Sequence, residues 1–367
     1  MRNLDKFKGC MYGGAIGDAL GAEIEFYSEE DIFERFGERG ITEYVMRRGV
    51  AEWSDDTQMT LFTATGLLSC KSNDADKYAR SIYYSYRDWY KTQTEAYPLP
   101  DGSRHSWLAN IPALFSCRAP GRTCLSALSR MLPGTTKFPI NQSKGCGGIM
   151  RVAPIGLYFC DSHLSVQESD RLGAEAAAIT HGHELGWLPA VAQVHILRVL
   201  SESAGATIKE AALDSMEVIK QLYPRAKELD YLLSLMQRAI DLSEEDEDDL
   251  DAIHLLGRGN VAEETLAIAL YCSLKYSGNF EKGIIAAVNH GGDSDSTGAV
   301  TGNILGAALG INQIPNKWTE PLEMRSIIET IADDLYRGGI TDDAGNHLDP
   351  FWKAKYDDMS YPFGADD

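Results

Sequence analysis

Two short acidic clusters near opposite ends of the chain carry the residue types best suited to chemistry. One reads Trp53-Ser54-Asp55-Asp56-Thr57, and residues 291–297 read Gly-Gly-Asp-Ser-Asp-Ser-Thr. A helix start needs only one such side chain to cap its free N–H groups, whereas two carboxylates ~4 Å apart repel by ~4 kcal/mol at an effective dielectric of about 20. Folding opposes that crowding unless a cation neutralises it. The clusters therefore predict a hard-metal site with two magnesium or manganese ions.

Two other interpretations of the clusters must be weighed. Asp293, Asp295, Thr297 and Gly298 fit positions of an EF-hand calcium loop, but the position that requires a bidentate Glu is Ile304, so that interpretation fails. Simple helix capping explains either cluster alone as well as a metal does. It explains both together less well. Oxygen ligands without His or Cys favour magnesium or manganese over zinc or copper.

Composition narrows the class of protein. The 367 residues are 44% hydrophobic and 24% charged, which is typical of a soluble globular protein. A net charge of −20 argues against nucleic acid and anionic membranes as partners. No stretch approaches the ~20 apolar residues of a membrane span, and Asp18 interrupts the only segment that faintly resembles a signal peptide. Seven cysteines without a CxxC pair suit reduced thiols, so we expect a cytoplasmic protein.

Helical periodicity dominates the chain. Apolar residues at three- and four-residue steps predict a buried helix over 185–200, with His195 in the core. The same pattern predicts helices at about 57–70, 74–92, 122–132, 167–179, 207–221, 229–242, 261–276, 279–288, 296–310 and 323–337. The best candidate strand is 41–46, and 93–107 reads as a loop. We expect a mainly α fold, one domain over 1–367, with a solvated acidic loop near 243–251.

Glycine stripes mark two of the predicted helices. They comprise Gly13, Gly17 and Gly21 in one helix, and Gly298, Gly302, Gly306 and Gly310 in the other. Glycine inside a helix costs roughly 0.5–1 kcal/mol against alanine. Its repetition at every fourth residue therefore indicates a face where two backbones approach closely. We expect these helices in the middle of the bundle, near the metal site.

The motifs resemble, in combination, those of the ADP-ribosylglycohydrolase family, whose archetype is the dinitrogenase-reductase-activating glycohydrolase. The resemblance covers nearly the whole chain. It rests on residues 13–21 (Gly-Gly-Ala-Ile-Gly-Asp-Ala-Leu-Gly) followed by Glu25-Phe26, on Ser54-Asp55-Asp56-Thr57, on residues 145–151 (Gly-Cys-Gly-Gly-Ile-Met-Arg), on Thr180-His181 and on Gly292-Asp293-Ser294-Asp295-Ser296. It implies a compact, all-α, orthogonal multi-helix bundle with a dinuclear magnesium or manganese centre.

The resemblance assigns metal ligands and catalytic groups. The implied ligands are Ser54, Asp55, Asp56, Asp293, Asp295 and Ser296. Many relatives carry Thr at the two serine positions, but either residue offers a hydroxyl oxygen. Catalytic candidates are Asp56, as a carboxylate near oxocarbenium-like charge, Glu25 as the acid–base group, and Asp101 on a loop that matches the family poorly. A surface glutamate and a turn aspartate are the plain alternatives for the last two.

The resemblance also implies a pocket for ADP-ribose. Its expected members are Gly145, Cys146, Gly147, Gly148, Arg151 and His181. The glycines would let N–H groups approach an anion, and Arg151 would hold phosphate unless it forms a structural salt bridge. Many relatives have Asn at position 146, so one polar substrate contact is in doubt. His290 is expected to support the metal ligands.

These expectations together describe a metal-dependent hydrolase. It would remove ADP-ribose from a modified protein side chain, with arginine favoured by analogy with the archetype. Serine, another acceptor, nucleic acid or a small molecule remain open, as does the oligomeric state, for which a monomer is the simplest expectation. A non-catalytic ADP-ribose- or metal-binding regulator and a dinuclear phosphohydrolase are the rivals from other classes.

Overall fold

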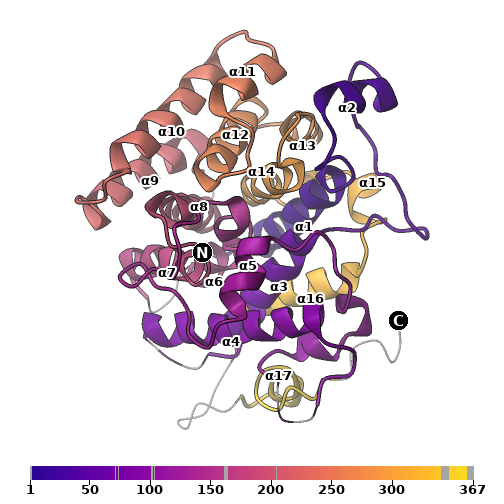
Figure 1. The fold of residues 1–367 in the computed structure, drawn as a ribbon, viewed down its shortest axis with the longest axis vertical. Helices are drawn as coiled ribbons and strands as arrows, with labels where there is room; N and C mark the ends of the chain where they lie inside the picture. Colours follow the sequence, from indigo (N-terminus) through magenta and orange to yellow (C-terminus); the bar gives the residue numbers. More distant parts are fainter. Residues whose placement is uncertain are drawn as a thin grey trace.

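The computed structural model describes residues 2–70, 72, 74–100, 102, 104–160, 164–203, 205–339 and 347–361. Over these ranges the regular elements are helices, and β-type pairing is limited to isolated bridges, so the all-α prediction is confirmed (Figure 1). The α-helices are α1 (Leu4–Gly21), α2 (Glu29–Phe36), α3 (Asp55–Leu68), α4 (Ala75–Thr94), α5 (Arg122–Leu128), α6 (Ala153–Tyr158), α7 (Val166–Ala178), α8 (Glu184–Glu202), α9 (Ile208–Leu222), α10 (Leu229–Glu244), α11 (Asp249–Leu256), α12 (Ala262–Lys275), α13 (Phe280–Val288), α14 (Ser294–Leu309), α15 (Asn316–Thr319), α16 (Arg325–Arg337) and α17 (Pro350–Tyr356).

The glycine stripes form the centre of the fold, as predicted. Helices α1 and α14 run antiparallel and meet glycine against glycine. A Cβ atom on Gly13 would lie 2.1 Å from the carbonyl oxygen of Gly302, and one on Gly17 would lie 1.9 Å from that of Gly298. No side chain larger than hydrogen fits at these positions without moving a backbone. Gly9 extends the stripe against Gly306, although the sequence pattern did not single it out.

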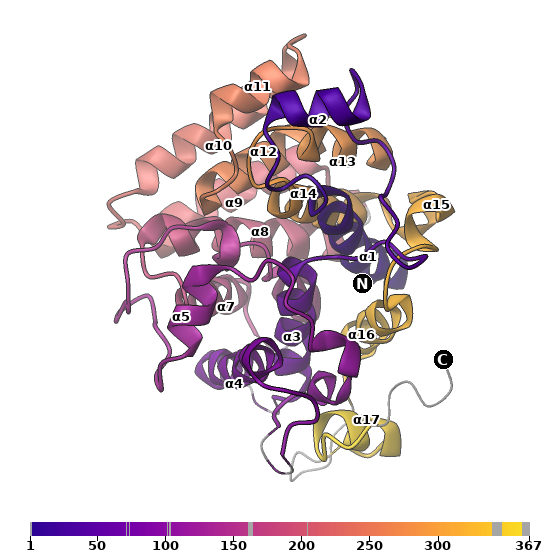
Figure 2. The same ribbon diagram turned by 45° about the vertical axis from the view of Figure 1, so that its right-hand side comes forward.

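The remaining helices cover this central pair. Figure 1 and Figure 2 both place α10 to α13 at one end of the molecule and α4 and α17 at the other, with α1 and α14 between them. Helix α3 is buried on every side, as a helix in the interior must be when it is apolar all round. The two helices that begin at the acidic clusters, α3 and α14, therefore both start inside the protein.

Long periodic segments were predicted to within a few residues, and several short helices were missed. The expectation of a helix over 74–92, for example, is met by α4, which spans Ala75–Thr94. Helix α2 was not expected because it has almost no apolar face: Ile32 is its only buried residue. A capping box between Ser28 and Asp31 starts the helix. Two turns of helix give periodicity too little length to register.

The predicted strand over 41–46 is wrong. No regular element occupies these residues, and the nearest bridge pairs Arg47 with Val50. Instead, the side chain of Asn289 takes the place of a partner strand: it accepts from Ile41 N (2.7 Å) and donates to Ile41 O (2.9 Å). One amide side chain thus satisfies the backbone that a sheet would otherwise pair.

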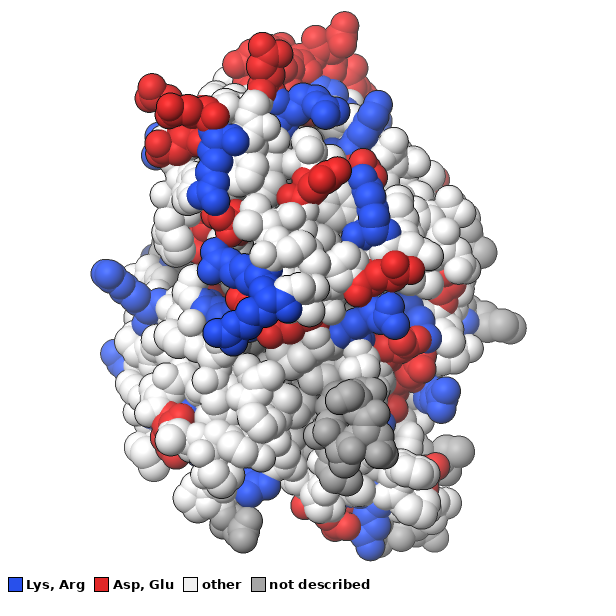
Figure 3. Space-filling model, turned by 90° about the vertical axis from the view of Figure 1, so that its right-hand side faces the viewer, with Lys and Arg blue, Asp and Glu red and all other residues white. Residues whose placement is uncertain are grey.

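The acidic segment near 243–251 is shorter as a loop than predicted. Residues 245–248 are exposed, but α11 begins at Asp249. Asp249 is partly buried and accepts hydrogen bonds from the hydroxyls of Tyr271 (2.8 Å) and Tyr276 (2.6 Å). Figure 3 shows a dense group of acidic side chains at one end of the face it presents, with basic ones spread over its middle. None of the described helices has the length and apolarity needed to cross a bilayer.

Candidate active site

Both acidic clusters do cap helices, as the simplest interpretation required. The Ser54 side chain accepts a hydrogen bond from Asp56 N (3.2 Å) at the start of α3. Asp293 accepts one from Ser296 N (3.3 Å) at the start of α14. Each helix N-terminus carries partial positive charge, which stabilises carboxylates beside it. Asp295 Oδ1 also accepts from Ser296 N (2.9 Å), but capping leaves Asp56 unexplained.

The two clusters meet, although about two-thirds of the chain separates them. The Ser296 hydroxyl donates to Asp56 Oδ2 at 2.8 Å. Helix α1 helps to hold them: Asp18, wholly buried between its glycines, accepts from Ser54 N (2.8 Å) and Thr57 N (2.9 Å), and from the Thr57 hydroxyl. The packing of α1 on α14 therefore fixes the start of α3 relative to the start of α14.

A pocket of about 170 Å³ opens at this junction. Most of the residues proposed as ligands line it, together with members of the glycine-rich segment: Glu25, Asp55, Asp56, Asp293, Asp295, Ser296, Gly145, Cys146, Gly147 and His181. Ser54 lines the adjoining hollow instead, which shares Glu25 and Ala119 with this pocket. Five carboxylates thus face one small volume.

Burial and mutual repulsion destabilise the state in which all five carboxylates are ionised. Burial, followed by the charges of neighbouring aspartates, raises the pKa values of Asp56 and Asp295 well above the usual range. Burial raises the pKa of Asp55 to about 8, and that of Glu25 to about 8 with the charges of neighbouring aspartates as the next cause. Within the described residues, no Lys, Arg or His forms an ion pair with any of these carboxylates. Arg122 also lines the pocket, but its side chain is exposed and forms no ion pair with these carboxylates among the described residues.

The donor set fits a hard divalent cation. Carboxylate and hydroxyl oxygens are the ligands that magnesium and manganese prefer, and Glu25 Oε2 is buried without a hydrogen-bond partner. In the described part of the chain, however, no three His, Cys, Asp or Glu side chains are grouped as an ion would group them. The aspartates instead accept from protein donors, as Asp293 Oδ2 does from Cys146 Sγ at 2.8 Å. The residues are assembled, and their oxygens are not gathered about a common point.

A loop that sequence reasoning did not identify folds over Asp55. The carbonyl of Arg118 accepts from Asp55 N (3.1 Å), and Gly121 N donates to Asp55 Oδ2 (3.2 Å). Between them Ala119 has φ of 52°, a left-handed conformation that non-glycine residues seldom adopt. Such strain often accompanies a functional site. No motif in residues 116–121 would have indicated this role.

The glycine-rich segment is shaped by close packing. Residues Cys146–Gly148 form one 3-10 turn. A Cβ atom on Gly147 would lie 2.9 Å from Cys124 Sγ and 3.0 Å from His181 Cε1, and one on Gly148 would lie 2.5 Å from Gly186 O. The glycines let the turn pack closely against its neighbours, with Gly147 lining the pocket.

Cys146 and His181 both face the pocket in uncharged form. Burial and then the charge of Asp293 raise the pKa of the Cys146 thiol well above its usual value, which disfavours the thiolate that a nucleophile requires. Burial and then the charge of Arg151 lower the pKa of His181 to about 3. A neutral ring at this position can form hydrogen bonds to a substrate but cannot supply charge for phosphate.

Arg151 does not have the expected position in the phosphate site. Its side chain is wholly buried and lies outside the pocket lining. It donates to Ala176 O (3.1 Å) and to the Thr180 hydroxyl (2.7 Å), with its guanidinium 4.3 Å from the centre of the Tyr86 ring. Thr180 Oγ1 in turn lies 2.8 Å from His181 Nδ1. Arg151 therefore orients His181 through Thr180.

Three further residues complete the comparison with the sequence predictions. Asp101 lies outside the described residues. His290, expected to support the metal ligands, instead contacts the first turn of α14, with Nε2 2.9 Å from the Thr297 hydroxyl, and burial lowers its pKa to about 4. Asp18 was quoted in a motif and given no role, yet it anchors the start of α3. A carboxylate inside a glycine stripe, where burial is predicted, was the available signal.

The chain is similar to known proteins along most of its length. A family model described as ADP-ribosylglycohydrolase matches residues 1–344. An uncharacterised protein of Archaeoglobus fulgidus is 29% identical, over 90% of this chain and 96% of its own length. The ADP-ribosylhydrolase ARH3 of Homo sapiens is 24% identical, over 92% and 94%.

Two further likenesses concern a named activity and the fold. The ADP-ribosylarginine hydrolase Tri1 of Pseudomonas putida is 24% identical, over 91% of this chain and 78% of its own length. A solved structure titled "ADP-ribosylglycohydrolase-related protein complex" has a TM-score of 0.58 and 25% identity, and the match covers 91% of this chain and 98% of that one.

Proposed function

The chain belongs to the ADP-ribosylglycohydrolase family, whose members are glycosidases that use metal ions, and we propose that it hydrolyses the bond between ADP-ribose and a modified protein side chain. Its cofactors would be two magnesium or manganese ions, and its products ADP-ribose and the unmodified side chain. The observation that carries this proposal is the convergence of Asp56 and Ser296 in a pocket of buried carboxylates, none of which is ion-paired to a cation among the described residues.

The ligands would come from both helix starts. Asp55, Asp56 and Ser54 would be contributed by α3, with Asp293, Asp295 and Ser296 from α14. Bound divalent ions can orient a ribose and lower the pKa of a water molecule. Asp18 holds the start of α3 in position, and the Gly121 N–H fixes one oxygen of Asp55.

The chain's own acid–base group would be Glu25. Hydrolysis adds OH to the anomeric carbon of the ribose, and the proton of the attacking water must reach the departing nitrogen or oxygen. Glu25 Oε2 faces the pocket without a hydrogen-bond partner, so it is free to transfer that proton. Asp56, as a buried carboxylate, would stabilise oxocarbenium-like charge at the reacting carbon. His181 and the turn at Cys146–Gly148 would form the wall against the ADP-ribose.

Arginine is the acceptor that we favour. Among the relatives, the name of Tri1 specifies ADP-ribosylarginine, whereas that of ARH3 specifies no acceptor. A cytoplasmic location is part of the proposal, because all seven cysteines are free in the described chain and reduced thiols are typical of that compartment.

A linkage panel tests the function. The purified chain would be incubated with arginine-, serine- and otherwise ADP-ribosylated peptides, with magnesium, with manganese or with a chelator, and the products identified by mass spectrometry. We expect intact ADP-ribose to be released from the arginine peptide, and we expect the chelator to abolish this release. AMP as product would instead indicate a phosphohydrolase. ADP-ribose binding without release, unchanged in Asp55→Ala and Asp293→Ala, would indicate a non-catalytic regulator.

A further inference from the structure

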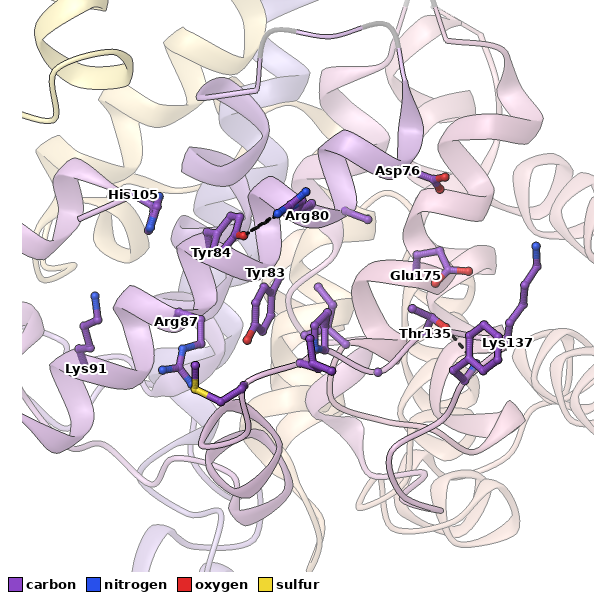
Figure 4. Close-up of a pocket in the computed structure, with 17 residues that line it drawn as sticks. Asp76, Arg80, Tyr83, Tyr84, Arg87, Lys91, His105, Thr135, Lys137 and Glu175 are labelled. Carbon is purple, nitrogen blue, oxygen red and sulfur yellow. Dashed lines mark hydrogen bonds between the residues drawn. The ribbon is translucent and has the colours of Figure 1, made fainter. Parts of the chain in front are cut away.

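A second hollow, of about 780 Å³, lies along one face of α4 and shares no lining residue with the acidic pocket. Figure 4 shows its labelled side chains spread along the helix and across to a facing loop. The contributions of α4 recur at helical spacing from Asp76 through Arg80, Tyr84 and Arg87 to Lys91. At 1.5 Å per residue the hollow follows α4 for about 22 Å. We call it the α4 groove.

The opposite wall is apolar and exposed. It consists of residues 131–135, 137 and 138, and Glu175 and Ile179 also line the groove. Met131, Leu132 and Phe138 have exposed fractions of 82%, 75% and 78%, and large apolar side chains grouped in this way on a surface mark a binding site. Phe138 is held in place by a turn: Phe138 N donates to Thr135 Oγ1 (2.9 Å) and Thr135 N to Phe138 O (3.2 Å).

The groove is basic in a strongly acidic protein. Arg80, Arg87 and Lys137 have no carboxylate within ion-pair distance in the described part of the chain. Arg80 donates to the Tyr84 hydroxyl (3.2 and 3.1 Å), and Arg87 to the carbonyls of Leu128, at the end of α5, and of Arg130. The net charge of the chain is −20. Three unpaired cations in one apolar hollow therefore differ in sign from the excess charge of the protein.

The two acidic residues of the groove do not cancel this charge. Glu175 accepts from the backbone N–H and the hydroxyl of Thr136, so its carboxylate braces the loop wall. Asp76 lies in the first turn of α4, where the partial positive charge of the helix start compensates a carboxylate. Both carboxylates keep their charge, but they are outnumbered by the three unpaired cations, so the net charge of the groove is positive.

We propose that the α4 groove binds an acidic amphipathic segment of a partner protein, its apolar side chains against Met131, Leu132 and Phe138 and its carboxylates on Arg80, Arg87 and Lys137. A length of about 22 Å suits some four turns of helix, and a helix laid in an apolar groove is a recurrent mode of peptide recognition. The apolar wall and the acidic net charge disfavour nucleic acid, which needs a broad basic surface. The exposed acidic run 245–248 of a second copy has no apolar side chain, so it does not match the groove.

Binding of a designed peptide tests the proposal without reference to catalysis. The probe is a fluorescein-labelled peptide of about 15 residues, with Leu and Phe on one helical face and Glu on the other. Fluorescence anisotropy should show micromolar binding to the full chain. In Arg80→Glu/Lys137→Glu the affinity should fall by roughly tenfold or more. Both side chains are exposed, and neither lines the acidic pocket.

A matched variant and a charge-swapped probe sharpen the result. Lys227→Glu/Lys282→Glu makes the same change of net charge at exposed lysines outside the groove and should bind the probe like the wild type. A probe with Lys in place of Glu should bind Arg80→Glu/Lys137→Glu better than the wild type. Equal loss of affinity in both variants, no binding to the wild type, or tighter binding of a single-stranded oligonucleotide than of the peptide would overturn the proposal.

Discussion

The acidic pocket and the α4 groove differ both in the sign of their charged side chains and in how far those side chains are buried. The pocket has buried carboxylates at two helix starts and no protein cation paired with them among the described residues. The groove has exposed cations beside exposed apolar side chains. Buried charge without a partner is costly, so it is kept where a ligand of opposite charge belongs. Exposed charge costs little and affects which partners approach. The contrast indicates chemistry in the pocket and recognition in the groove.

The largest expected effect is a loss of turnover when the pocket, but not the groove, is altered. Asp56→Asn keeps an acceptor for the Ser296 hydroxyl but removes a negative charge from the pocket. Hydrolysis of an ADP-ribosylated arginine compound should fall by about 10³-fold, because lost cation chemistry is worth several kcal/mol. Arg80→Glu/Lys137→Glu should leave that rate unchanged. Steady-state assays of both variants measure the difference, and comparable losses in the two would remove the distinction.

The substitution Asp56→Asn should not lower the stability of the fold. Asn is neutral, so repulsion and burial cost within the carboxylate group decrease. In the presence of chelator we expect a midpoint of thermal unfolding at least as high as that of the wild type. Magnesium should raise the midpoint of the wild type more than that of the variant. A variant that is less stable in chelator would show that Asp56 is mainly structural.

The second effect tests what holds the pocket together. Gly302→Ala would put a Cβ atom 1.9 Å from Gly13 O, and overpacking of this kind should cost about 3 kcal/mol. Urea unfolding followed by circular dichroism measures it. Gly278→Ala, where nothing lies within 4 Å, is the control and should change stability by no more than about 0.5 kcal/mol. Where Gly302→Ala remains folded, it should weaken cation binding and spare the α4 groove.

The third effect concerns α7, which supplies Glu175 to the lining of the groove. His195 of α8 is buried between Asp170 Oδ2 (2.9 Å) and Asp214 Oδ2 (3.0 Å). Burial lowers its pKa, but hydrogen bonds and charge from the two aspartates outweigh burial and raise the pKa overall. Below about pH 6.5 the ring is charged in the folded and the unfolded chain, and the contribution of these contacts to stability is complete. It is lost as the pH rises through the raised folded-state pKa.

Stability should therefore decline from about pH 6 to about pH 8 more steeply in the wild type than in His195→Gln. Urea unfolding across this range, with magnesium constant, gives the two slopes. Burial raises the pKa of Asp170 too, and this also lowers stability with rising pH, but mainly in the more acidic range where carboxylates titrate. Parallel slopes for the two proteins would mean that His195 stays neutral.

The smallest effect is the response to salt. Raising NaCl from about 50 to about 500 mM should weaken binding of the acidic probe to the α4 groove severalfold, because the exposed cations are screened. Turnover of a small ADP-ribosylated compound should change less, since the carboxylates of the pocket are buried. Anisotropy titrations and initial rates at the same salt concentrations give the comparison. A probe affinity independent of salt would point to apolar contact alone.

How much the sequence could predict depended on whether a feature was local. Glycine repeats every fourth residue indicated the close packing of α1 on α14, because that spacing is a property of one helix. The absence of a strand at 41–46 depends on Asn289, far along the chain, and no local pattern contains that information. Short helices such as α2 were missed for lack of length.

The same holds for the site. Residues inside motifs, such as Asp55 and Asp293, could be selected because their types and neighbours indicated chemistry, and the structure brings them to one pocket. Arg151 was wrongly expected to face phosphate, since a motif does not say on which side of a turn a long side chain is buried. The loop at Ala119 and the α4 groove combine residues without a motif, so only the folded chain brings them together.

Crystals of the chain soaked in manganese chloride, with anomalous diffraction recorded at the manganese edge, test the central claim most directly. The account predicts anomalous peaks among Asp55, Asp56, Asp293 and Asp295, with the oxygens of both helix starts drawn onto the ions. Manganese bound to only one cluster, or absent from the pocket in crystals of protein that still releases ADP-ribose, would contradict it.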